Sequence, residues 1–234
     1  RKMLEPAACV HMLSVAKTQL HEAQQPLEYE AVLGYPGAPA SLDAEGGRTV
    51  RRLRGAYDRD ACFHDWARDP RVVGKLRQLF DEPVCLTLAH HNSVMTKHPQ
   101  FGTATGWHRD IRYWSFTKPD LICVWLALGD EISSNGGLKF IPGSHRLAIA
   151  REQLDELDFL RPDYLPNQAL FAQGKPVDLH QGDVVFFHSQ LFHAAGVNTT
   201  SSVKTSVAFA YHGNSNQPVA GSKSATAGDI VISD

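Results

Sequence analysis

The stretch LICVWLAL, residues 121–128, is an unbroken apolar run of the length of one β-strand. Asp120 precedes it and Gly129 follows it, and residues of these types commonly bound strands. Four further runs are apolar or alternate apolar with polar residues: 83–89 (PVCLTLA), 138–141 (LKFI), 184–187 (VVFF) and 203–211 (VKTSVAFAY). Several short strands separated by turn residues are typical of a β-sandwich or barrel.

The N-terminal third has helical rather than alternating patterns. Residues 5–24 place apolar side chains at the spacing of an amphipathic helix, with Pro6 suited to its first turn. A second helical stretch, from about Asp60 to Phe80, is interrupted by Pro70. We therefore expect one domain with four features: a mostly helical N-terminal support (1–82), a β-rich core (83–212), a helical insert in that core (about 147–160) and a loop-like tail (213–234).

The composition is that of an ordinary globular protein without strong charge. Of the 234 residues, 43% are hydrophobic and 21% are charged, which suffices for one sizeable core. Lysine and arginine number 23 against 25 for aspartate and glutamate, so nothing favours nucleic acid or an anionic membrane as a partner. No apolar run approaches the roughly 18 residues of a membrane span, and the first twenty residues lack the apolar centre of a signal peptide. We therefore expect a soluble, cytoplasmic protein.

Cysteine and histidine are the residue types that most often mark metal sites. The cysteines are scattered and include no C-x-x-C pair, which argues against a zinc ribbon and against a disulfide framework. We interpret all of them as reduced core thiols: Cys9, Cys62, Cys85 and Cys123. The chain has 12 histidines, and most of them fall between residues 88 and 212, so a metal site is to be sought in the β-rich core.

The segment GWHRD, residues 106–110, contains an H-x-D pair. Side chains two apart on a strand project from the same face, so His108 and Asp110 can offer an imidazole nitrogen and a carboxylate oxygen to one point. Alone, this pattern also fits a surface ion pair at a strand end. A second cluster downstream favours a metal site: Gly182, Asp183, His193, Asn198 and Lys204. Two imidazoles and one carboxylate on one side of a metal leave the opposite positions open, as in non-haem Fe(II) oxygenases.

Between the two clusters lies NGGLKFIPGSHR, residues 135–146. Together with W-H-x-D (107–110), V-W-x-A-L (124–128), G-D-x-x-x-F (182–187) and H-x4-N (193–198), it resembles the phytanoyl-CoA dioxygenase family of Fe(II)/2-oxoglutarate oxygenases. The matches occur in order and extend over more than half of the chain. The resemblance implies a mainly β protein with flanking helices, folded as a double-stranded β-helix (a cupin-like jelly roll) with the iron near one open end.

By position, the resemblance implies that His108, Asp110 and His193 are the catalytic Fe(II) ligands. Three other histidines compete for the third position: His180, His188 and His212. His193 is preferred because the family's asparagine, here Asn198, and a basic residue follow it at the expected distance.

The cosubstrate 2-oxoglutarate has a distal carboxylate that must meet a cation in a largely dry pocket. The family usually places an arginine about eleven residues after the second histidine, and this chain has Lys204 there, the only lysine or arginine between Lys175 and Lys223. Lysine offers a point charge where arginine offers a two-pronged fork. Ser206 shares a strand face with Lys204 and is a candidate hydrogen-bond donor to the cosubstrate. The resemblance adds further candidate contacts to the cosubstrate: Trp125, His91 and Ser93.

The reaction implied by the resemblance is hydroxylation of an unactivated C–H bond of a small organic substrate. It uses O₂ and converts 2-oxoglutarate to succinate and CO₂. The carboxylate of Asp110 favours hydroxylation, because halogenases of this family have a small residue in its place. Arg109 and Arg112 are candidates for binding an anionic group of the substrate, although solvated surface charges give the same pattern. No segment resembles a dedicated coenzyme A site, so the substrate stays open.

Two other functional classes stay open from the sequence. A non-catalytic jelly-roll module that binds a metal or a small molecule is compatible with Lys204 in place of the arginine. A hydrolytic zinc site is less favoured, because an H-x-D pair with a distant histidine lacks the extra base that such sites use.

Overall fold

The five apolar runs of the sequence all form β-strands in a computed structural model that describes residues 2–232. They are β3 (Val84–Lys97), β5 (Leu121–Ala127), β6 (Leu138–Phe140), β8 (Val184–His188) and β10 (Lys204–Gly213). The described chain has further strands: β1 (Leu27–Tyr29), β2 (Val50–Arg54), β4 (Thr105–His108), β7 (Lys175–Pro176), β9 (His193–Ala195) and β11 (Asp229–Ile232).

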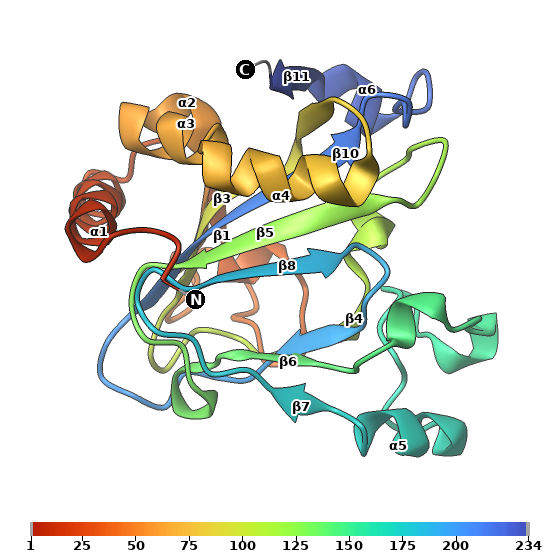
Figure 1. The fold of residues 1–234 in the computed structure, drawn as a ribbon. Coiled ribbons are helices and arrows are strands. Elements are labelled where there is room, and N and C mark those ends of the chain that lie inside the picture. The colour runs from red at the N-terminus through yellow and green to blue at the C-terminus, as the bar shows by residue number, and fades with distance from the viewer. Residues whose placement is uncertain (1, 233–234) are drawn as a thin grey trace.

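The strands form two antiparallel sheets (Figure 1). The larger sheet has the order β1-β2-β3-β10-β5-β8, and β11 pairs with β3 outside this path. The smaller sheet has the order β4-β9-β6-β7. Side chains from both sheets form a common apolar core that includes Trp125, Leu138, Phe140 and Phe187. The predicted fold class, a double-stranded β-helix with flanking helices, is confirmed.

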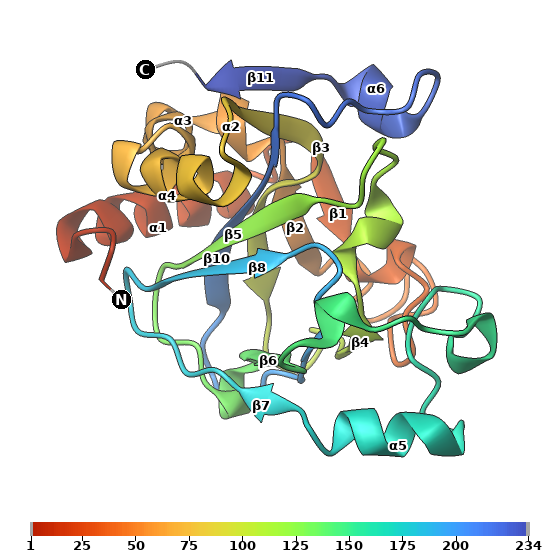
Figure 2. The ribbon, with the colours of Figure 1, turned by 45° about the vertical axis from the view of Figure 1, so that its right-hand side comes forward.

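Helices cover the outer face of the larger sheet (Figures 1 and 2). They are α1 (Pro6–His21), α2 (Ala56–Arg59), α3 (Ala61–Ala67) and α4 (Pro70–Phe80), and α5 (Leu165–Phe171) lies beyond the smaller sheet. Both predicted helical stretches are confirmed, and the interruption at Pro70 is where α4 begins. Along β10, Phe209 and Tyr211 pack into the core beneath the helices, whereas Ala208 and Ala210 pack between the sheets. None of the helices within residues 2–232 has both the length and the apolarity that a membrane crossing requires.

The prediction of a helical insert at residues 147–160 was wrong. Its only helical element is the short 3₁₀ turn η5 (Arg151–Gln153), and the chain then folds back on itself so that Leu154 bridges Leu160. Polar side chains here bond to local backbone and so compete with helix formation. Asp155 Oδ1 accepts hydrogen bonds from the backbone N–H groups of residues 157 and 159.

The N-terminal and C-terminal regions contain strands that were not predicted. The N-terminal stretch predicted as a mostly helical support also contributes β1 and β2 to the larger sheet. The tail predicted as loop-like contains the short helix α6 (Lys223–Ala227) and β11, which lie together at one end of the molecule (Figure 2). The strand β11 was missed because it is short and follows a long run of small and polar residues.

Strand β3 contains a large bulge near its middle. Its ladder with β10 pairs Asn92 with Phe209 and then Thr87 with Ala210, so residues 88–91 have no partner on β10. Within this bulge, His90 has a left-handed backbone with φ of 58°. Bulges redirect side chains and are frequent near functional sites.

Candidate functional site

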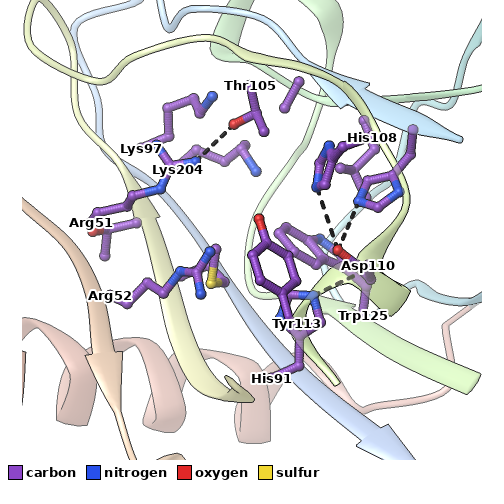
Figure 3. Close-up of a pocket in the computed structure, with 15 residues that line it drawn as sticks. Arg51, Arg52, His91, Lys97, Thr105, His108, Asp110, Tyr113, Trp125 and Lys204 are labelled. Atoms are coloured by element: carbon purple, nitrogen blue, oxygen red, sulfur yellow. Dashed lines mark hydrogen bonds and ion pairs between the residues drawn. The ribbon is translucent and has the colours of Figure 1, made fainter. Parts of the chain in front are cut away.

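Three side chains that are distant in the sequence converge at the rim between the sheets. His108 ends β4 and His193 begins β9, and the two residues are partners across that strand pair. Asp110 begins the 3₁₀ turn η2 (Asp110–Tyr113). Its Oδ1 lies 3.4 Å from His108 Nε2 and 3.5 Å from His193 Nε2, and all three side chains are buried. Figure 3 shows how His108 and Asp110 point toward one another. The expected grouping is therefore present, and the ligand atoms lie close enough together to hold one metal ion.

The H-x-D spacing predicts that His108 and Asp110 share one face of a strand, but the structure brings them together in a different way. The strand β4 ends at His108, and the chain then turns, with the backbone N–H of Ile111 donating to Ser189 O. The turn, rather than two alternate positions of one strand, brings the carboxylate of Asp110 to the two imidazoles.

The hydrogen bonds of these residues suit a divalent cation. His108 Nδ1 donates to Gly106 O at 2.9 Å and His193 Nδ1 donates to Leu191 O at 3.1 Å, which leaves a lone pair on each Nε2. Asp110 Oδ1 is buried and has no hydrogen-bond partner. A buried acceptor without a partner is costly in a folded protein, and a metal ion bound by both Nε2 atoms would satisfy it.

Charge and burial favour the protonation states that metal ligands need. Burial opposes ionisation of Asp110, but interactions with the surrounding histidines, His91 foremost, hold the pKa of its carboxyl well below its usual value. Burial lowers the pKa of His193 to about 4, so its imidazole is neutral near pH 7. A carboxylate and a neutral imidazole are the forms that bind metals.

The second oxygen of Asp110 is held by the protein. Asp110 Oδ2 lies 3.0 Å from His91 Nε2, at the bulge of β3, and 3.3 Å from Cys123 Sγ on β5. Burial raises the pKa of the Cys123 thiol, so it stays protonated and can donate. His91, predicted as a cosubstrate contact, thus contacts a candidate metal ligand and also lines the adjoining cavity. From the sequence, Cys123 was recognised only as a core thiol.

The cavity next to the three candidate ligands has a basic wall (Figure 3). Four cations line it: Arg51, Arg52, Lys97 and Lys204. Only Lys204 was predicted. Arg51 and Arg52 were missed because β2 was not recognised as a strand. Lys97 was missed because it precedes His108 in the sequence, whereas the family's cation follows the second histidine.

Three of the five residues predicted to bind the cosubstrate, Lys204, Ser206 and Trp125, lie together, but they already bind a carboxylate of the protein. Glu131, between β5 and β6, is fully buried and pairs with Lys204, whose Nζ is 2.9 Å from Oε2. Ser206 Oγ donates to Glu131 Oε1 at 2.5 Å, and Trp125 Nε1 lies 3.0 and 3.1 Å from the two carboxylate oxygens. The sequence analysis had not singled out Glu131.

The remaining predicted contact, Ser93, is fully buried, and its hydroxyl donates to His90 O at 3.2 Å. It is not among the residues that line the cavity, so its contact with a cosubstrate stays a prediction. The three histidines that competed with His193 lie beside other carboxylates. His180, His188 and His212 are 3.2, 3.3 and 3.3 Å from Asp130, Asp120 and Asp229, respectively.

Comparison with known proteins identifies relatives by sequence. The family model described as phytanoyl-CoA dioxygenase (PhyH) matches residues 18–206. A probable phytanoyl-CoA dioxygenase from Caenorhabditis elegans is 25% identical over 174 residues, which cover 71% of this chain and 55% of that protein. An ectoine dioxygenase from Streptomyces anulatus is 33% identical over 112 residues, 45% of this chain and 36% of that protein. The chain thus spans about half, or less, of the length of these curated relatives.

Solved structures share the fold. The epimerase SnoN, in complex with Fe3+, alpha ketoglutarate and nogalamycin RO, superposes with a TM-score of 0.73 at 20% identity, covering 94% of this chain and 80% of that one. EctD from S. alaskensis, with 2-oxoglutarate and 5-hydroxyectoine, also has a TM-score of 0.73, at 17% identity, covering 93% of this chain and 72% of that one. Because the family model matches most of the sequence, the chain belongs to the phytanoyl-CoA dioxygenase family.

Proposed function

We propose that this protein is an Fe(II)- and 2-oxoglutarate-dependent dioxygenase that hydroxylates an unactivated C–H bond of a small organic substrate. The observation that carries the proposal is the convergence of His108 Nε2 and His193 Nε2 on Asp110 Oδ1, a buried oxygen without a partner. Two imidazoles and one carboxylate on one side of a metal are the ligand set of non-haem Fe(II) oxygenases. Bound Fe(II) would supply the activation of O₂ and the oxidation of the C–H bond.

The protein's own contribution is to hold the ligands in position. Backbone carbonyls fix the rings of His108 and His193, and His91 and Cys123 fix one oxygen of Asp110. Such contacts set the tautomer and orientation of ligands before a metal binds. The family relationship, and the presence of iron and 2-oxoglutarate in SnoN, support Fe(II) and 2-oxoglutarate as the groups that use this site.

The surroundings of Arg112 support the proposal that the small substrate is anionic. Its guanidinium lies over the ring of Phe159, 4.5 Å from the centroid, and its Nη1 is buried without a hydrogen-bond partner. Arg109 Nε is also buried without a partner, but Arg109 Nη2 donates to Ser144 O and Leu147 O at 2.6 and 2.8 Å, which ties this side chain to the backbone. We therefore assign the anion contact to Arg112 and a structural role to Arg109.

The test is release of succinate and CO₂ from 2-oxoglutarate by the Fe(II)-loaded protein in air, with small anionic compounds screened for stimulation. We expect turnover that His193→Ala abolishes, because that variant lacks one ligand. His180→Ala, at an exposed histidine, should retain it. A chlorinated product would contradict the hydroxylase assignment.

A non-catalytic module that binds a metal or small molecule is the second candidate. It is favoured by the ion pair between Lys204 and Glu131, which engages the cation expected to bind the cosubstrate. Metal binding that His193→Ala removes, without any succinate release by the wild type, would support this candidate over the dioxygenase.

A further inference from the structure

Glu131 accepts hydrogen bonds from all three donors of a site that we call the Lys204 site, defined as Lys204, Ser206 and Trp125. The ammonium group reaches one carboxylate oxygen, the hydroxyl reaches the other, and the indole N–H lies within 3.1 Å of both. An ammonium, a hydroxyl and an indole N–H around one carboxylate satisfy it completely. The Lys204 site is thus built for a carboxylate, and the protein supplies one.

The carboxylate of Glu131 is fixed in this site by its backbone. Glu131 N donates to Leu179 O at 2.8 Å, and Leu179 N donates to Glu131 O at 2.9 Å, which anchors the segment after β5 to the segment before β8. The Glu131 side chain has no exposed surface. A buried carboxylate with three donors would be costly to displace, because it would have to find other partners or reach water.

The other cations of the cavity are also mostly neutralised. Arg51 pairs with Glu30 at 3.1 Å, and Arg52 pairs with Glu28 at 3.1 Å. Within residues 2–232, Lys97 is the one cation of this wall without a carboxylate partner, and its Nζ donates to two backbone carbonyls. Little unpaired positive charge of the cavity wall is therefore left to favour a diacid over a monoacid.

We propose that Glu131 is a selectivity residue: it fills the Lys204 site, so the protein favours 2-oxoglutarate only weakly over 2-oxo acids with an uncharged tail. The inference rests on the proposed use of a 2-oxo acid as cosubstrate. Removing the charge of Glu131 frees the ammonium group of Lys204 for the distal carboxylate of 2-oxoglutarate, which increases selectivity for the diacid.

The test compares 2-oxoglutarate with 2-oxopentanoate, which has the same five-carbon chain without the distal carboxylate. Calorimetry on the Zn(II)-loaded protein measures both dissociation constants without turnover. We expect the wild type to prefer 2-oxoglutarate by less than about tenfold, and Glu131→Gln to increase that preference by about tenfold or more. Glu131→Ala, which vacates the same site, serves if the glutamine variant does not fold.

Two control variants separate the Lys204 site from a general change of charge. In the double variant Glu131→Gln/Lys204→Met the gain in selectivity should disappear, because no ammonium group remains in the site. Asp229→Asn removes the charge of a carboxylate that lies beside His212, away from this cavity, and should change the preference by less than about threefold.

Three results would overturn the inference: a wild-type preference for 2-oxoglutarate above about tenfold, a gain below about tenfold in Glu131→Gln, or an equal gain in Asp229→Asn. In each of these cases a 2-oxo acid still binds, so the proposed function is untouched. Failure of both oxo acids to bind the wild type and every variant would instead contradict the proposed function and the inference together.

Discussion

The two carboxylate oxygens of Asp110 have different surroundings. Oδ1 faces two imidazoles and has no hydrogen-bond partner, whereas Oδ2 is held by His91 and Cys123. Without the contacts to Oδ2, the carboxylate could rotate and direct either oxygen at the imidazoles. His91 is therefore a positioning residue for a candidate ligand, although it is not itself in the ligand set.

Replacing His91 by leucine should weaken metal binding while all three candidate ligands remain. We expect the affinity for Zn(II) to fall by about 10- to 100-fold, the usual effect of losing a hydrogen bond to a metal ligand. Competition with a chromophoric chelator measures this affinity. His212→Leu is the matched control, because His212 is also buried beside a carboxylate, Asp229. An equal loss in both variants would show that general destabilisation, not the contact to Asp110, is responsible.

Among single residues, those in local motifs were predictable and those defined by tertiary contacts were not. His108, Asp110 and His193 lie in motifs that resemble those of the family, and the resemblance implied their grouping before the fold was known. Glu131 could not be predicted as the partner of Lys204, because a carboxylate in a turn is usually solvated and nothing local shows that it is buried. The role of Cys123 likewise depends on a tertiary contact, that of its Sγ with Asp110 Oδ2.

At the scale of elements, Lys97 joins three segments around the cavity. It is the last residue of β3, and its Nζ donates to Thr103 O at 2.9 Å, before β4, and to Gly196 O at 2.7 Å, after β9. Burial and, to a smaller extent, the charges of Arg51 and Lys204 lower the pKa of Lys97 to about 7, against the opposing charges of Glu30 and Glu131. The strand end is thus held by a group that titrates near neutral pH.

This lowered pKa predicts that stability rises with pH above neutrality. Below about pH 7 both the folded and the unfolded chain hold the proton of Lys97, so stability carries the full penalty of a buried charge. Between about 7 and the ordinary value of 10.5, only the unfolded chain holds it, so unfolding takes up a proton and the free energy of unfolding increases with pH. One proton corresponds to a slope of about 1.4 kcal/mol per pH unit.

Urea unfolding of the wild type and of Lys97→Met between pH 7.5 and about 9.5 measures this slope. We expect unfolding of the variant to take up fewer protons than unfolding of the wild type, by up to about one proton. Comparing the two proteins removes the contribution of other groups that titrate in this range. Lys223→Met, at an exposed lysine of α6, should keep the slope of the wild type. Parallel curves for the wild type and Lys97→Met would show that Lys97 does not titrate there.

Elements were predictable where the local pattern was long enough to be distinctive. The five runs that form β3, β5, β6, β8 and β10 are apolar or alternating, and Pro6 and Pro70 mark the starts of helices. The strands β1 and β9, of three residues each, lie outside these runs and were therefore not recognised. The segment 147–160 has the composition of a helix, but its polar side chains bond to nearby backbone instead.

At the scale of the whole molecule, the candidate metal centre connects the two sheets. Its histidines lie on β4 and β9 of the smaller sheet, and Asp110 is held by His91 and Cys123 of the larger one. A metal ion bound there would link elements that are otherwise joined by core packing and by loops. Metal binding should therefore stabilise the fold as a whole.

Stripping the protein of metal with a chelator should lower its melting temperature reversibly. At a free metal concentration of about 100 times the dissociation constant, binding stabilises the folded state by about 2.7 kcal/mol. For a chain of this size that corresponds to a shift of about 5 to 10 °C. Scanning calorimetry with added Mn(II) or Zn(II) measures it, and His193→Ala should remove the shift. A shift of the same size in that variant would locate the metal elsewhere.

The bulge of β3 allows the chain to change length beside the candidate metal centre. Residues 88–91 stand outside the ladder between β3 and β10, and pairing resumes on both sides of them. Insertions or deletions confined to this interval leave the alternation of the surrounding sheet intact. Evolution can thus remodel what touches Asp110 separately from the framework that supports it, and laboratory libraries confined to these four positions should retain the fold while diversifying the centre.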